Sequence, residues 1–222
     1  MNVLIVYWHP EPKSFNHAMF VKAREALAAA GAEVKTSDLH DMGFDPVSGR
    51  SNFKSVKDAG YLKPQLEEMH ATEVNGFSEL LDAEMRKVEW CDLMVWQFPL
   101  WWFALPAPLK GWVDRVFAMG RLYGGGRVYD KGVCRGKRAM LSLTTGGPQA
   151  AYREDGFNGD IDAILRPIHR GILQFVGFDV LAPQIVYAPV RMTDEQRRDE
   201  LDRFGRRLSR IAGEVPVEIG RY

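Results

Sequence analysis

This sequence of 222 residues has only two cysteines and no formal net charge. Its only two cysteines, Cys91 and Cys134, form no CxxC pair and no cluster with histidine, which argues against structural zinc and a disulfide framework. The 29 basic side chains balance 29 acidic ones, so no net field attracts nucleic acid or anionic lipid. No basic leader and no apolar run long enough to span a bilayer is seen. We therefore expect a cytoplasmic protein that binds no metal, nucleic acid or membrane.

The chain does contain a repeated order of buried strands and amphipathic helices. Val3 to Trp8 is a nearly continuous apolar run, typical of a parallel strand covered on both faces, and residues 19–30 then repeat at helical spacing. Further strands are predicted over 32–36, 92–98, 137–144 and 178–187, the last interrupted at Pro183. Further helices are predicted over 77–88, 106–119 and 160–175, and from a capping box of Thr193 and Gln196 to Ile211.

Five strands joined by helical crossovers predict an α/β fold, because parallel neighbours need such crossovers. We expect one domain over residues 1–222, with a doubly wound parallel sheet and helices on both faces. The periodicity is lost from residue 38 to residue 75. An excursion of this length is expected to be functional or to wrap a partner.

Three loops follow predicted strand ends, where sheets of this kind bind ligands. The first contains His9 and ends in Ser14 and Asn16 at a helix start, which suits a phosphate, although an ordinary N-cap also explains Ser14. The second, 99–103, has three adjacent aromatic side chains, which either fill core or form the wall of a planar site. The third, 145–152, contains two glycines that allow close backbone approach to a ligand, with a plain turn as the alternative.

Several separated motifs occur in a recognisable order. They are His9 with Ser14-Phe15-Asn16, then Gln97 to Phe103 leading to Leu109-Lys110-Gly111-Trp112, then Tyr129-Asp130-Lys131-Gly132, and Leu143 to Gly147 with Tyr152. This pattern resembles the NAD(P)H:quinone oxidoreductase family over almost the full length. The resemblance implies a flavodoxin-like fold with strand order 2-1-3-4-5, bound FAD, NADPH or NADH as co-substrate, and a homodimer with the site at its interface.

The resemblance also implies roles for individual residues. The cofactor is expected to contact the first loop, the aromatic loop, the third loop and an adenine-side arginine: His9, Ser14, Phe15, Asn16, Pro99, Leu100, Trp101, Trp102, Phe103, Thr144, Thr145, Gly146, Gly147, Tyr152 and Arg197. The substrate is expected to contact Trp102, Phe103 and Tyr123.

Three positions depart from the family pattern, at Trp101, Asn158 and Gly125. They stand where family members have a glutamine, a histidine paired with the tyrosine, and a second pocket tyrosine. For catalysis we predict that Tyr152 and the Gly146 and Gly147 amides stabilise the negative charge that develops when hydride arrives. Asn158 then adds a hydrogen bond or caps the next helix, and Tyr152 as mere packing is the alternative.

The expected function is FAD-dependent, two-electron reduction of quinones by NAD(P)H, with both substrates using one pocket in ping-pong order. A one-electron FMN carrier would share the fold, but the zero net charge counts against the acidic docking surface such carriers use. Two further alternatives stay open. One is a regulatory flavoprotein subunit of a potassium-efflux transporter, and the other is reduction of azo or nitroaromatic compounds, which pocket shape would decide.

Overall fold

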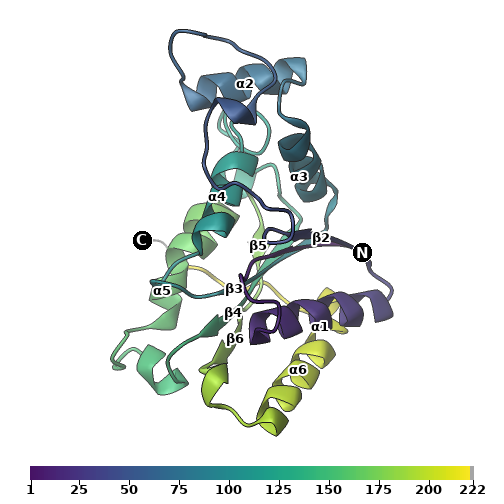
Figure 1. The fold of residues 1–222 in the computed structure, drawn as a ribbon, viewed down its shortest axis with the longest axis vertical. Coiled ribbons are helices and arrows are strands. Elements are labelled where there is room, and N and C mark those ends of the chain that lie inside the picture. The colour runs from purple at the N-terminus through teal and green to yellow at the C-terminus, as the bar shows by residue number, and fades with distance from the viewer. Residues whose placement is uncertain (221–222) are drawn as a thin grey trace.

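A computed structural model describes residues 1–220, in which a parallel sheet lies between two layers of helices (Figure 1). The strands are β1 (Asn2–Tyr7), β2 (Glu33–Asp38), β3 (Leu93–Pro99), β4 (Arg138–Thr145), β5 (Asp179–Val180) and β6 (Gln184–Tyr187). Their order is β2-β1-β3-β4-β5, and β6 also pairs with β4. The predicted order is confirmed. The predicted last strand is two short strands, because Pro183 has no N–H to continue the ladder.

Within residues 1–220 the α-helices are α1 (Phe15–Ala29), α2 (Pro64–Val74), α3 (Glu79–Trp90), α4 (Ala107–Val116), α5 (Ile161–Ile168) and α6 (Asp194–Leu208), and all but α2 cover the sheet. Helices α1 and α6 pack on one face, and α3, α4 and α5 share the core on the other. Short 3-10 turns lie at Arg50–Asn52, Tyr129–Lys131, Gln149–Tyr152, Pro189–Arg191 and Ile211–Gly213. Within residues 1–220, no helix combines the length and the apolar character that crossing a membrane requires.

Two helical predictions need correction. The helix expected over 160–175 is α-helical only to Ile168 and continues as a π-helical turn, His169–Gln174. Pro167 supplies no N–H inside this helix, which is one known cause of such irregularity. Helix α2 was not predicted, although it has a proline in its first turn and a left-handed Asn75 at its C-terminal cap. The capping box of α6 is confirmed.

The excursion between β2 and α3 projects from one end of the sheet (Figure 1) and is fastened to α4. Arg115 donates to Asn52 Oδ1 (2.8 Å) and to the Asp45 carbonyl. Pro46 packs so closely on Gly111 that a Cβ there would lie 2.4 Å from the Pro46 Cα. The start of the excursion is therefore fixed in place, while α2 beyond it leaves apolar side chains exposed, namely Leu66, Met69 and Val74.

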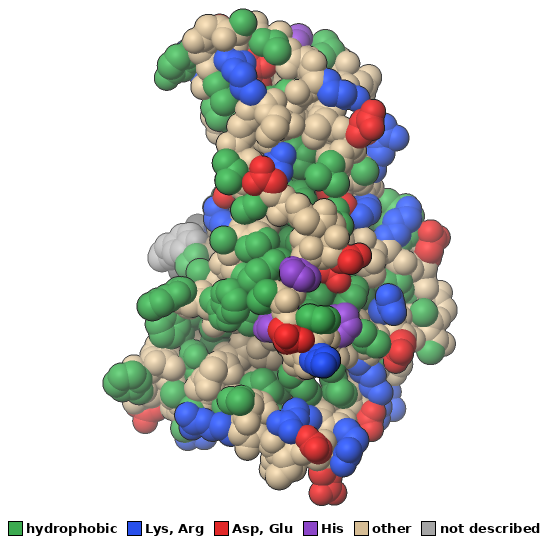
Figure 2. All heavy atoms as spheres, viewed as in Figure 1, with side chains coloured by type: hydrophobic (Ala, Val, Ile, Leu, Met, Phe, Trp, Pro, Cys, Tyr) green, Lys and Arg blue, Asp and Glu red, His purple; other side chains and the backbone are tan. Residues whose placement is uncertain are grey.

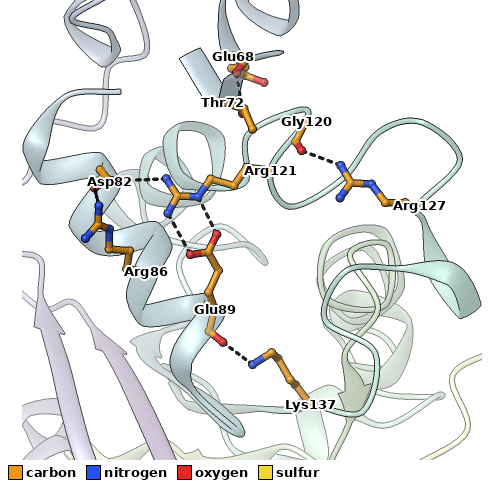
Figure 3. A network of polar contacts seen from close by, with 9 residues as sticks. All are labelled: Glu68, Thr72, Asp82, Arg86, Glu89, Gly120, Arg121, Arg127 and Lys137. Atoms are coloured by element: carbon orange, nitrogen blue, oxygen red, sulfur yellow. Dashed lines mark hydrogen bonds and ion pairs between the residues drawn. The ribbon is translucent and has the colours of Figure 1, made fainter. Parts of the chain in front are cut away.

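The loop after α4 is held by two arginines (Figure 3). Arg121 donates through Nε and Nη2 to the Glu89 carboxylate (2.7 and 3.0 Å) and through Nη1 to Asp82 (2.6 Å), both on α3. Arg127 donates to the carbonyls of Gly120 (2.7 Å) and Gly124 (3.1 Å). This network fixes the position of Tyr123, which lies between the two arginines in the sequence.

Candidate functional site

A cavity of about 850 Å³ opens at the carboxyl ends of β1, β3 and β4. Twelve of the predicted cofactor residues line it: His9, Ser14, Phe15, Asn16, Pro99, Leu100, Trp101, Trp102, Thr144, Thr145, Gly146 and Arg197. Three lining residues were not predicted: Lys13, Pro189 and Val190. Figure 2 shows hydrophobic side chains gathered across the middle of the molecule on this view, beside histidine side chains. The cavity therefore brings together three loops, the first and last of which are more than a hundred residues apart in the sequence.

One end of the cavity is built by the start of α1. The Ser14 side chain accepts a hydrogen bond from the His17 N–H (3.1 Å), so Ser14 is the N-cap. Within the described residues, no hydrogen bond uses the N–H groups of Phe15 and Asn16. Free N–H groups at a helix N-terminus, together with the helix dipole, favour an anion such as phosphate.

His9 adds a neutral donor at this end. His9 Nδ1 lies 3.0 Å from the Glu11 N–H and 3.2 Å from the Glu11 carbonyl. We assign Nδ1 of the neutral ring as the acceptor of the shorter contact, which places the hydrogen on Nε2. Burial lowers the pKa of His9, against the smaller opposing effect of the Glu11 backbone. The ring is therefore neutral at pH 7, and its Nε2–H remains available.

Arg197 closes the same end in an unexpected way. Its Nη1 donates to the carbonyls of Pro189 (3.0 Å) and Met192 (2.6 Å), and its Nη2 pairs with the Asp194 carboxylate. These bonds hold the turn that carries Val190 against the cavity. Arg197 thus shapes the wall as well as lining it, which its place in the sequence did not indicate.

An aromatic turn forms another part of the cavity wall. The Ala104 N–H donates to the Trp101 carbonyl (3.0 Å), and the two central residues, Trp102 and Phe103, have φ of 51° and 57°. Turns of this kind normally take asparagine and glycine, because large side chains disfavour left-handed backbone. Trp101, Trp102 and Phe103 are 44%, 94% and 49% exposed, so the core alternative is wrong. Phe103 itself does not line the cavity.

The third loop places the predicted catalytic residues together beside the cavity. Thr145 Oγ1 donates to the Gly147 carbonyl (2.8 Å), which tightens the loop. A Cβ on Gly147 would lie 3.1 Å from Tyr152 Cε2 and 3.4 Å from Asn158 Nδ2, whereas one on Gly146 would meet nothing within 4 Å. Tyr152 is buried, and none of Gly147, Tyr152 and Asn158 lines the cavity directly.

The structure also shows where two other predicted residues lie, Asn158 and Tyr123. The N-cap of α5 is Asp160, which accepts from the N–H groups of Asp162 and Ala163, so Asn158 does not cap that helix. Tyr123 lies away from the cavity, against Phe175 (ring centroids 5.6 Å apart) and within 3.4 Å of Gln65 Nε2. A single chain therefore does not bring Tyr123 to the aromatic turn.

Comparison with known proteins places this geometry in context. The model of a family described as having a flavodoxin-like fold matches residues 1–208. The chain is 41% identical over 216 residues to a ribosyldihydronicotinamide dehydrogenase (quinone) from Rattus norvegicus, covering 97% of this chain and 94% of that protein. It is 41% identical over 215 residues to NAD(P)H dehydrogenase (quinone) 1 from Cavia porcellus, covering 96% and 78%. A crystal structure of a protein assigned as a quinone reductase from Klebsiella pneumoniae superposes with a TM-score of 0.94 at 37% identity, covering 98% and 87%.

Proposed function

The chain belongs to the family with the flavodoxin-like fold, and on that premise we propose that it is an NAD(P)H dehydrogenase (quinone) that works with FAD. The observation that carries the proposal is the single cavity in which free helix N–H groups, an aromatic wall and an open glycine backbone converge. A phosphate-bearing cofactor with a planar, polar-edged ring needs these three features together.

The residues present fit a flavin dinucleotide. The N–H groups of Phe15 and Asn16 would hold its phosphates, and Trp101 and Trp102 would contact its ring. Gly146 leaves room for close approach of a polar edge. When bound, a flavin accepts hydride from a dihydronicotinamide and returns two electrons to a quinone.

The exposure of the aromatic turn supports a shared pocket. Trp102 and Phe103 are exposed, which leaves an open aromatic surface for a planar substrate. We infer that donor and quinone occupy this surface in turn, which would give ping-pong kinetics. Tyr152 and the Gly146 and Gly147 amides would stabilise the negative charge that develops on reduction, with Asn158 in support. The names of the relatives indicate a dihydronicotinamide donor, either a dinucleotide or the shorter riboside.

We also propose that the enzyme is a homodimer of single-domain chains. The excursion exposes apolar side chains on α2, which a second copy would cover. Tyr123, too far from the cavity of its own chain, would reach the pocket of the partner. A reducing, cytoplasmic location fits the two cysteines, which are both free. Burial raises the pKa of Cys91 to about 11 and that of Cys134 to about 12, so neither thiol is reactive at neutral pH.

Reduction of azo or nitroaromatic compounds is a second candidate. A Cβ on Gly125 or Gly126 would meet nothing within 4 Å, so this stretch of the Tyr123 loop is open. If the loop borders the partner's pocket, larger planar acceptors would fit there.

The absorption spectrum of the purified protein tests the main proposal. We expect a yellow protein whose denaturation releases FAD, and steady-state quinone reduction with parallel double-reciprocal lines when NAD(P)H and quinone are both varied. A colourless protein that ignores added FAD would contradict the proposal. Bound FMN in place of FAD would contradict the choice of cofactor alone.

FAD affinity is expected to rise as the pH falls below about 6.5, the ordinary pKa of histidine. The free protein holds His9 neutral because burial lowers its pKa, and a bound phosphate would favour the protonated ring. Binding therefore takes up a proton in this range. Fluorescence titration should show this trend for FAD, but not for riboflavin, which has no phosphate, and not for His9→Gln. A pH trend shared by riboflavin would show that His9 does not face the phosphates.

A further inference from the structure

A chain of buried polar side chains leads from the middle of the sheet to the cavity. Gln97 on β3 is fully buried, Asn16 on α1 is 4% exposed, and Thr144 on β4 is 6% exposed. Gln97 Nε2 donates to Asn16 Oδ1 (2.8 Å), and Asn16 Nδ2 donates to Thr144 Oγ1 (2.8 Å). Asn16 and Thr144 line the cavity, whereas Gln97 does not. These hydrogen bonds thus connect a residue outside the cavity lining to two residues that line it.

The direction of these hydrogen bonds is set at Gln97. Its Nε2 also lies 3.8 Å from Met19 Sδ, a weak acceptor, which agrees with the amide nitrogen being on this side. Because Gln97 donates to Asn16 Oδ1, Asn16 must turn its amide nitrogen toward Thr144. Thr144 Oγ1 then accepts, and its hydroxyl hydrogen has no acceptor among residues 1–220. Thr144 is left as a donor toward the cavity.

The stability of the sheet does not explain a glutamine at this position. Gln97 pairs in register with Tyr7 and Ser142 in a strand buried on both faces, where apolar residues are usual. Its Oε1 has no hydrogen-bond partner in the described part of the chain. A buried amide with an unsatisfied oxygen destabilises the folded state relative to an apolar side chain. The role of Gln97 therefore lies in orienting Asn16, the side chain to which its amide N–H donates.

We propose that Gln97 is a positioning residue for the flavin, which acts by fixing Thr144 as a hydrogen-bond donor to an acceptor atom of the cofactor. This inference rests on the proposed function, since it assumes that a flavin occupies the cavity. It assigns a role to a residue that touches neither cofactor nor substrate.

Gln97→Glu tests the direction of the hydrogen bonds from Gln97 through Asn16 to Thr144. When ionised, the introduced carboxylate can only accept, so Asn16 would present its amide nitrogen to it and its oxygen to Thr144, which would remove the donor from the cavity. When protonated, the carboxyl can donate as glutamine does. Burial raises the pKa of such a group. We expect the variant to bind FAD as tightly as wild type near pH 6 and about tenfold more weakly near pH 9, each measured relative to wild type at the same pH.

Ser142→Ala is the matched control. Ser142 is as buried as Gln97 and is its register partner, but it takes no part in the chain, so FAD affinity should stay unchanged. Thr144→Val should weaken binding by about the same factor at every pH. In the double variant with Gln97→Glu, the pH dependence should vanish. Thermal unfolding of the apoproteins serves as a readout of folding that is independent of the flavin.

The outcomes distinguish failure of the positioning role of Gln97 from failure of the proposed function. If wild type binds FAD and the affinity ratio for Gln97→Glu is the same at both pH values, the positioning role is wrong and the proposed function stands. If Gln97→Glu does not fold, unchanged affinity in Thr144→Val would overturn the inference by itself. If wild type binds no flavin, the proposed function fails, and this inference fails with it.

Discussion

Replacing Trp102 by asparagine should make the apoprotein more stable and the enzyme less active. Trp102 is 94% exposed and has φ of 51°, so its side chain gains little burial while its backbone is in a disfavoured region. Asparagine tolerates this conformation, and relief of the strain should contribute about 1 kcal/mol. For a chain of this size the melting temperature should rise by about 2 to 4 °C. Differential scanning calorimetry of the apoprotein measures this change.

The same substitution removes an aromatic side chain from the cavity wall. Stacked aromatic contacts contribute on the order of 1 kcal/mol beyond their buried area, so Trp102→Asn and Trp102→Ala should lower flavin affinity and kcat/KM for quinone at least tenfold. Strained backbone that is kept at a site despite its cost is consistent with a functional requirement.

Trp101→Ala is the matched comparison, because it should lower stability, which loss of Trp102 should not, and reduce turnover less. Trp101 is less exposed than Trp102 (44% against 94%), packs edge-on against Trp8 with ring centroids 5.1 Å apart, and is not in the left-handed region. Its loss should lower the melting temperature and reduce turnover less than loss of Trp102. Equal and negligible effects on turnover at the two positions would show that this turn does not face the flavin ring.

The aromatic turn also shows where prediction from sequence stops. Its place after β3 follows from the apolar run 93–98 and the rule that ligands bind beyond strand ends. Its conformation does not follow, because Trp102 and Phe103 are residues that local propensity excludes from left-handed positions. Only tertiary contacts, such as that of Trp101 with Trp8, can impose the turn.

Helix α2 illustrates a different limit. Its sequence alternates charged and apolar residues without a clear apolar stripe, since Glu67 and Glu68 are buried while Leu66 and Met69 are exposed. Buried Glu67 accepts the N–H groups of Lys57 and Asp58 (2.8 and 2.9 Å), and Glu68 accepts that of Met119 (2.6 Å). The first two contacts tie α2 to the loop before it, and the third joins residues 51 positions apart. Periodicity, which predicted the sheet and the other helices, carries no information about them.

The polar chain behind the cavity was hidden for a related reason. The motif that includes Gln97 was recognised, but Gln97 lies within an apolar strand, and nothing local indicates that its amide meets Asn16, 81 residues earlier. Most residues that line the cavity could be predicted because loops after parallel strands converge. The layer behind it depends on the pairing of β3 with β4 and the packing of α1, which only the folded chain defines.

Tyr152→Phe should slow reduction of the bound flavin by dihydronicotinamide about tenfold to a hundredfold. Hydride transfer places negative charge on the polar edge of the flavin, and a donor aimed there lowers the barrier. Tyr152 is buried and lies against Gly147, whose backbone borders the cavity-lining Gly146. The substitution removes only the hydroxyl group, so packing against Tyr187 (ring centroids 5.8 Å apart) is preserved.

Two variants distinguish this role from alternatives in the same stopped-flow experiment. Tyr187→Phe removes the hydroxyl of the neighbouring tyrosine, which is not among the nearest neighbours of Gly147 as Tyr152 is, and should reduce at the wild-type rate. Asn158→Ala should have a smaller effect than Tyr152→Phe, because an amide at this position has no proton to exchange in the working pH range and offers only a fixed N–H. Its Nδ2 would lie 3.4 Å from a Cβ on Gly147, so this side chain is close enough to the same loop to take over the role. A wild-type rate in Tyr152→Phe together with slow reduction in Asn158→Ala would assign the charge-stabilising donor to Asn158 and leave Tyr152 as packing.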